Sequence, residues 1–175
     1  MEFSRIDRGP DAAQLAAIAP AALISLAGVI ALALPLRLFE ATAPTPLIPL
    51  LVVYHWTATR PEEFPAPVIL VLGFIQDLLL GAPLGLAAAA YLAVRWLTLT
   101  QSEFLRGREG GAMWAGMAVM GAAAGLIFWI SASIEARGLA PILPAVAQIG
   151  LTVLLYPVAA RLFERARRRS EGEAA

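Results

Sequence analysis

Residues 112–134 read AMWAGMAVMGAAAGLIFWISASI, a run without a single charged side chain. A helix rises about 1.5 Å per residue, so ~20 apolar residues cross the hydrocarbon core of a bilayer, which is about 30 Å thick. The run is long enough and apolar enough to do so. It therefore predicts a transmembrane helix.

The composition extends this prediction to most of the chain. The chain has 175 residues, of which 59% are hydrophobic and 15% are charged, whereas ordinary soluble domains are about a quarter charged. A small soluble domain keeps too much surface in water to hide so many apolar side chains. The 13 basic residues balance 13 acidic ones, so net charge gives no indication of nucleic-acid binding. The absence of cysteine excludes disulfides and thiolate metal sites.

Five further apolar runs are separated by charged or turn-forming residues. Together with the first they predict an all-α integral membrane protein with six helices in one bundle, forming a single domain. The expected spans are residues 15–36, 44–58, 65–80, 84–99, 112–134 and 139–160, with a basic cytoplasmic tail at 161–175. The second span is short. It crosses only if the residues before Leu47 also enter; otherwise it thins the bilayer or is sheltered by neighbouring helices.

The arginines predict the orientation, because positive charge accumulates on the cytoplasmic side of a membrane. With six spans, one side receives Arg5, Arg8, Arg60, Arg106, Arg108 and five arginines of the tail, whereas the other receives Arg37 and Arg137. Arg95, near the end of the fourth span, can reach the arginine-rich side. We therefore expect a multi-pass protein of the bacterial inner membrane with both termini cytoplasmic.

The first run also contains a signal-peptide-like sequence, Ala31-Leu32-Ala33. Its apolar part is longer than that of a usual signal peptide, which favours a retained anchor. Cleavage would leave the orientation of the other five spans unchanged.

Asp77 is the one acidic residue inside an apolar run, where a charge is costly and needs a partner. Gly73, Asp77 and Gly81 are four residues apart, so they share one helical face on which small residues let another helix approach. We interpret Asp77 as a hydrogen-bonded anchor between helices, because no second intramembrane acid accompanies it. The alternative is a relay for protons or ions, or a substrate contact. Gln76 and Gln148 are candidate partners.

Two other patterns concern contacts between helices and with the membrane surface. Gly121 and Gly125 have the Gly-x-x-x-Gly spacing of tight helix contacts, either within the chain or with a partner helix. Tyr54, His55 and Trp56 are predicted to lie at the cytoplasmic membrane interface, which aromatic residues favour.

The tail is expected to contact anionic lipid headgroups or a cytoplasmic partner, or simply to retain this end inside the cell. Its arginines are Arg161, Arg165, Arg167, Arg168 and Arg169. The chain offers no nucleophile-and-base set, no phosphate-binding loop and too few ligands for a metal. We expect neither enzymatic activity nor a cofactor.

Two stretches carry a resemblance to a known family. Residues 46–56 read PLIPLLVVYHW, and residues 73–86 read GFIQDLLLGAPLGL. They resemble the bacterial rod shape-determining protein MreD family, whose members have a Pro-started apolar run ending in Tyr-Trp, followed by a Gly-x-x-x-Asp-x-x-x-Gly-x-x-Leu-Gly helix and turn. The resemblance covers about residues 44–95. His55, inserted between the tyrosine and the tryptophan, departs from the pattern, and the first forty residues and last two spans carry no matching motif.

The resemblance implies a fold like that of the six-helix substrate-binding subunits of energy-coupling-factor vitamin transporters. It implies a non-enzymatic scaffold of the cell-elongation complex, which binds the bitopic protein MreC and connects with the actin-like MreB and with the glycosyltransferase and transpeptidase of wall synthesis. The candidates for helix packing or partner binding are Gly73, Asp77, Gly81, Pro83, Gly85, Gly121 and Gly125. One alternative is a small-molecule or vitamin-binding transporter subunit, which would need several converging polar groups. A membrane-embedded enzyme is disfavoured by the missing catalytic set.

Overall fold

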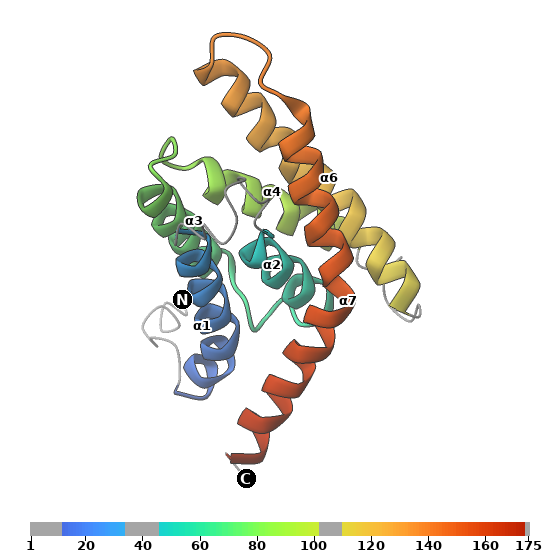
Figure 1. Cartoon of the computed structure of the whole chain (residues 1–175). Helices are drawn as coiled ribbons and strands as arrows, with labels where there is room; N and C mark the ends of the chain where they lie inside the picture. Colours follow the sequence, from blue (N-terminus) through green and yellow to red (C-terminus); the bar gives the residue numbers. More distant parts are fainter. Residues whose placement is uncertain (1–11, 34–45, 102–109, 174–175) are drawn as a thin grey trace, which may run out of the picture.

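The computed structural model describes residues 12–33, 46–101 and 110–173, and every regular element within them is an α-helix (Figure 1). The helices are α1 (Ala12–Ala33), α2 (Ile48–Thr59), α3 (Ala66–Leu80), α4 (Leu86–Thr100), α6 (Gly110–Glu135) and α7 (Ile142–Glu173). The prediction of an all-α fold is confirmed for the described residues. Residues 34–36 and 44–45, which belong to the first two predicted spans, lie outside them.

The helices differ in length. Within the described residues, α6 and α7 are the two that are long and apolar enough to cross a membrane, over Gly111–Glu135 and Ile142–Arg165. Helices α3 and α4 are apolar but have 15 residues each, which corresponds to about 22 Å at the helical rise. Helix α7 continues beyond the predicted end of the sixth span, so the start of the basic tail is helical.

Helix α2 lies at the centre of the packing. It has 12 residues, and all nine from Pro49 to Thr57 are buried. It contacts α1, α4, α6 and α7. A helix that is apolar on all sides is expected to be enclosed by other helices. Helix α2, which corresponds to the short second predicted span, is therefore surrounded by its neighbours in the structure.

The other helices pack in pairs around α2. Helix α3 packs on α4, α6 on α7, and α4 on α6, while α1 contacts both α2 and α3. Figure 1 shows α6 and α7 as a hairpin that extends beyond the four shorter helices, whereas the last part of α7 runs past α2 to the end of the chain. The buried core thus lies where α2 meets the pairs.

Two hydrogen bonds attach α7 to other helices around a proline. Pro157 lies inside α7 and has no N–H to donate to the carbonyl of Val153. The indole N–H of Trp114, from α6, donates to that carbonyl at 2.8 Å. One residue earlier in α7, the Thr152 hydroxyl accepts a hydrogen bond from the Leu47 N–H at 3.0 Å, which holds the start of α2.

Candidate functional site

Asp77 lies at the end of α3 and caps the helix that follows. Its side chain is buried, and its Oδ2 accepts a hydrogen bond from the Gly85 N–H at 2.8 Å. The Ala87 N–H lies 3.0 Å from Oδ1 and 3.2 Å from Oδ2. The first N–H groups of a helix lack partners within that helix and carry partial positive charge. The carboxylate of Asp77 thus supplies the acceptor that the start of α4 needs.

The three glycines around Asp77 have different structural roles. A Cβ at Gly73 would lie 2.3 Å from the Cα of Ala88, so this glycine lets α3 approach the backbone of α4. Gly81 ends α3 with φ +65°, and Gly85 precedes α4 with φ +92°. Both torsion angles are in the left-handed region that glycine adopts without strain. The face predicted for close packing therefore uses Gly73, while Gly81 and Gly85 shape the turn.

Two other residues near this turn, Pro83 and Gln76, form hydrogen bonds with other groups. Pro83 is exposed, and its carbonyl accepts a hydrogen bond from the Leu86 N–H at 3.1 Å. Gln76, a predicted partner of Asp77, instead accepts a hydrogen bond from the buried Tyr91 hydroxyl at 2.7 Å. The hydrogen bonds of the Asp77 side chain come from backbone N–H groups of the α4 start. The sequence could indicate that Asp77 needed partners, but not that backbone would provide them.

Gly121 and Gly125 both face α7. A Cβ at Gly121 would lie 3.3 Å from Cγ2 of Ile149, which is tight, and one at Gly125 would lie 1.8 Å from Cδ1 of the same side chain. The Gly-x-x-x-Gly pattern thus serves a contact within the chain. Gly28, which the sequence analysis did not single out, has the same role between α1 and α2, because its Cβ would lie 2.7 Å from Cγ2 of Ile48.

The aromatic segment of α2 is buried between helices and is not displayed at the surface. Tyr54, His55 and Trp56 are all buried. The Tyr54 hydroxyl donates to the carbonyl of Met113 in α6 at 2.8 Å. Trp56 and His55 each pack against the ring of Phe163 in α7. The three side chains, predicted to lie at the membrane interface, therefore join α2 to α6 and α7.

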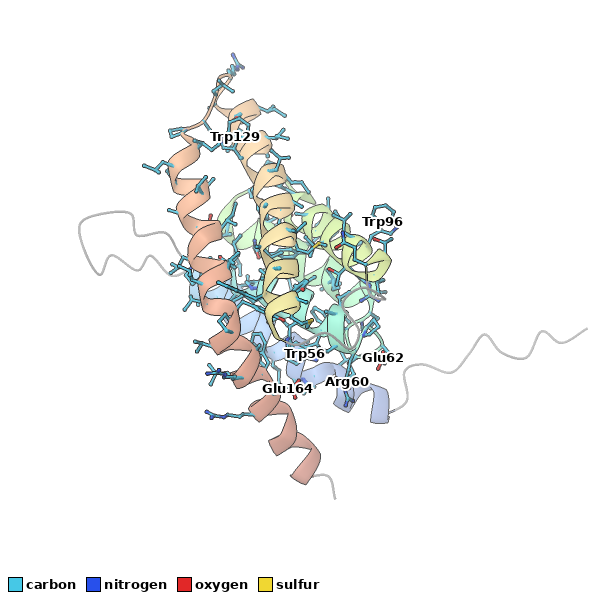
Figure 2. All side chains as sticks on the ribbon, turned by 90° about the vertical axis from the view of Figure 1, so that its right-hand side faces the viewer. Trp56, Arg60, Glu62, Trp96, Trp129 and Glu164 are labelled. Carbon is cyan, nitrogen blue, oxygen red and sulfur yellow. The ribbon has the colours of Figure 1, made fainter. Side chains whose placement is uncertain are left out.

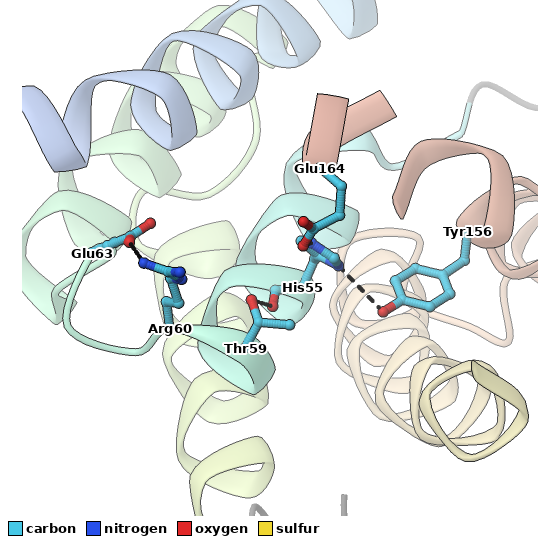
Figure 3. Close-up of polar contacts among 6 residues, drawn as sticks. All are labelled: His55, Thr59, Arg60, Glu63, Tyr156 and Glu164. Carbon is cyan, nitrogen blue, oxygen red and sulfur yellow. Dashed lines mark hydrogen bonds and ion pairs between the residues drawn. The ribbon is translucent and has the colours of Figure 1, made fainter. Parts of the chain in front are cut away.

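Two residues of α7 that the sequence analysis did not select complete this cluster. The Tyr156 hydroxyl lies 3.4 Å from Nδ1 of His55, and Oε1 of Glu164 lies 3.7 Å from Nε2 (Figure 3). Next to them, Arg60 and Glu63 form an ion pair at 2.8 Å. The only available signal was the histidine itself, since a histidine in an apolar helix needs polar partners.

The described arginines have distinct environments. Arg161 and Arg165 are exposed on α7, whereas the side chains of Arg167, Arg168 and Arg169 lie outside the described residues. Arg95 reaches from α4 to the turn between α2 and α3, where its guanidinium donates to the carbonyls of Phe64 at 2.7 Å and Pro61 at 3.3 Å. Arg95 therefore fixes this turn.

The outer surface of the bundle is strongly apolar. Figure 2 shows Trp96 of α4 turned outward, and this side chain is 65% exposed. Large exposed apolar side chains on α3 are Leu70, Val71, Phe74, Leu78, Leu79 and Leu80. Those on α7 are Ile142, Leu143, Val146, Leu154, Leu155, Val158 and Leu162. Buried positions, in contrast, include polar residues such as Gln76, Asp77 and Thr98.

A groove of about 410 Å³ lies between α6 and α7. It is lined by Ala122, Gly125, Leu126, Trp129, Ile142, Ala145, Val146, Ile149 and Gly150. These side chains offer hardly any polar surface for a ligand. Across the part of the chain that the structure describes, no group of three His, Cys, Asp or Glu side chains is arranged to hold a metal ion.

Comparison of the chain with protein-family models, with curated proteins and with solved structures gives no match.

Proposed function

We propose that the chain is a non-enzymatic scaffold embedded in the bacterial inner membrane, of the MreD type, with six helices in one bundle and both termini cytoplasmic. The observation that carries the proposal is the helix–turn–helix around Asp77. In the Gly-x-x-x-Asp-x-x-x-Gly-x-x-Leu-Gly motif, the three glycines and Asp77 each have a structural role in joining α3 to α4, whereas Leu84 is exposed. A motif of this kind builds a rigid reversal and requires no ligand.

The distribution of polarity supports the membrane environment. Large apolar side chains cover the outside of α3 and α7, while Asp77 and Gln76 are inside with hydrogen-bond partners. A soluble monomer rarely exposes continuous apolar surface of this extent. In a bilayer the same surface is solvated by lipid, and polar groups must be satisfied within the protein. The shortest helix, α2, is enclosed by longer ones, which shelters it from a thickness mismatch.

The partners proposed are those that the family resemblance implies. They are an MreC-type bitopic membrane protein, MreB, and the glycosyltransferase and transpeptidase of wall synthesis. The glycine faces of α3 and α6 are already used by contacts inside the chain. The exposed apolar faces, which include those of α3, α6 and α7, are the surfaces left for a partner helix.

The test is affinity purification of the tagged full chain from its native membranes in mild detergent, with membranes carrying the tag on an unrelated multi-pass protein as the control. Enrichment of a bitopic MreC-type protein together with wall-synthesis enzymes is the expected result. Recovery of a pair of transporter ATPases, or of a bound vitamin, would overturn the scaffold in favour of a transporter subunit.

Depletion of the protein gives an independent test in cells. Rod-shaped cells are expected to become round as lateral wall synthesis loses its direction. Cells that keep their width and their pattern of wall insertion after depletion would contradict the proposal.

A further inference from the structure

His55 sits between two side chains of a helix that is distant in the sequence. The residue is 6% exposed, near the end of α2. Its Nδ1 is 3.4 Å from the Tyr156 hydroxyl, and its Nε2 is 3.7 Å from Oε1 of Glu164. The ring also packs against Phe163, with ring centres 5.4 Å apart. As Figure 3 shows, both polar contacts of the ring join α2 to α7.

The contacts with Tyr156 and Glu164 are compatible with either protonation state of the His55 ring. A carboxylate only accepts hydrogen bonds, whereas a tyrosine hydroxyl donates or accepts. In the neutral ring, an N–H at Nε2 points to Glu164 while the Tyr156 hydroxyl donates to Nδ1. In the protonated ring both nitrogens donate, and the hydroxyl turns to accept. Only the protonated ring places a full positive charge beside the carboxylate of Glu164.

The titratable and charged groups around His55 come from α2, the turn after it and α7. Among the described residues they include Tyr54, Arg60, Glu63, Tyr156 and Glu164, and α7 also carries Arg161 and Arg165 on either side of Glu164. Arg60 and Glu63 pair with each other at 2.8 Å, so their charges largely offset. Arg161 and Arg165 are exposed, where water and salt screen their charges. Glu164 supplies the carboxylate that lies beside the ring.

Protons can reach the ring although it is buried. The Glu164 side chain is 42% exposed. A small cleft lined by His55, Thr59, Arg60, Glu63 and Glu164, with Trp56 and Phe163, has room for about one water molecule. Histidine is the side chain that ordinarily changes charge between pH 5 and 8. A change of charge on the ring would change its attraction to the carboxylate of Glu164.

We propose that His55, Tyr156 and Glu164 form a protonation-sensitive latch between α2 and α7. The charged ring attracts Glu164 and holds this part of α7 against the end of α2. When the ring is neutral the attraction is weaker, and this part of α7 samples a wider range of positions. The latch goes beyond the scaffold function and does not depend on it, because it rests on contacts within the chain.

The test measures the position of α7 relative to the turn after α2 at two pH values. The chain has no cysteine, so spin labels on Glu62→Cys and Arg165→Cys, both exposed positions, report one distance by pulsed electron paramagnetic resonance. The full chain in lipid nanodiscs is measured at pH 5.5 and pH 8.5. The expected result is a narrow distance distribution at pH 5.5 that becomes at least twice as wide at pH 8.5.

Two variants assign the effect. His55→Gln keeps a polar side chain without a titratable ring, and Glu164→Gln removes the carboxylate; both are expected to abolish the dependence on pH. Glu135→Gln, an exposed position at the end of α6, is the matched control and should keep it. A distribution that is equal at both pH values in the parent, or a response that survives in Glu164→Gln, would overturn the latch. If His55→Gln does not fold, the half-exposed Glu164→Gln decides alone.

Discussion

Asp77 is a carboxylate buried in apolar surroundings, and its contacts explain how it is tolerated there. Its oxygens accept hydrogen bonds from the Gly85 and Ala87 N–H groups, at the positive end of α4. These groups would otherwise lack partners. The N–H groups at the start of α4 stabilise the carboxylate, and the carboxylate provides the acceptor that they need. Asp77 therefore joins α3 to α4. The geometry does not require a proton or ion to move through this position.

Replacing Asp77 with Ala should destabilise the protein strongly. The substitution removes the acceptor from two buried N–H groups, which corresponds to a loss of about 2–3 kcal/mol in the free energy of unfolding. The measurement is unfolding of the purified protein by increasing SDS in mild detergent. Glu62→Gln, at an exposed position, is the control. If Asp77→Ala proves as stable as this control, the carboxylate does not hold the turn.

Replacing Gly73 with Ala and replacing Gly150 with Ala should have different effects on the free energy of unfolding. At Gly73 a Cβ would meet backbone atoms of Ala88, which cannot move aside without shifting α4, so Gly73→Ala should lower the free energy of unfolding by about 1–3 kcal/mol. At Gly150 nothing lies within 4 Å of the new Cβ, so Gly150→Ala should leave stability unchanged or raise it by up to about 1 kcal/mol. Equal effects in the same SDS titration would mean that α3 and α4 do not approach closely at Gly73.

The contact between α6 and α7 is a matter of side-chain fit. Gly125 and Gly121 provide the space that Ile149 occupies, and the Trp114 indole bonds the carbonyl that Pro157 leaves without a backbone donor. The hairpin thus depends on steric fit and on hydrogen bonds that include the one from the Trp114 indole. A partner helix is not needed to explain the glycines.

This fit predicts that one substitution rescues another. Gly125→Ala should cost about 1–2 kcal/mol, because its Cβ would overlap the end of Ile149. Adding Ile149→Val shortens that side chain, and the double variant should regain most of the loss in the SDS titration. If the loss in the double variant equals the sum of the losses in the two single variants, the Cβ at position 125 does not contact Ile149.

Some elements of the site could be predicted from the sequence, and others could not. The need of Asp77 for partners and the close approach at Gly73 follow from charge and side-chain size within one helix. The partners of His55 do not follow, because Tyr156 is 101 residues away and lies in an apolar run that gives no sign of its neighbours. Glu164 lies in the basic stretch 161–175, whose sequence likewise does not indicate a contact with His55.

At the scale of the whole molecule, the sequence predicts that α2 is a helix but does not identify the helices that surround it. Hydropathy predicted helices in every described apolar run, because few other structures satisfy the backbone in an apolar environment. It gave enclosure of α2 by neighbouring helices only as one alternative, and could not identify the neighbours as α1, α4, α6 and α7. A helix that is apolar on all sides has the same sequence pattern whether lipid or protein surrounds it. Only the contacts between helices distinguish the two.

The most direct measurement of whether the whole bundle lies in the bilayer is labelling of single cysteines in intact cells. The chain has no cysteine of its own. Glu62→Cys, Ala82→Cys and Arg137→Cys mark the turns after α2, α3 and α6. With a membrane-impermeant maleimide, Ala82→Cys and Arg137→Cys should be labelled from outside, and Glu62→Cys only after permeabilisation. Labelling of Glu62→Cys from outside, or protection of Ala82→Cys, would contradict six spans with cytoplasmic termini.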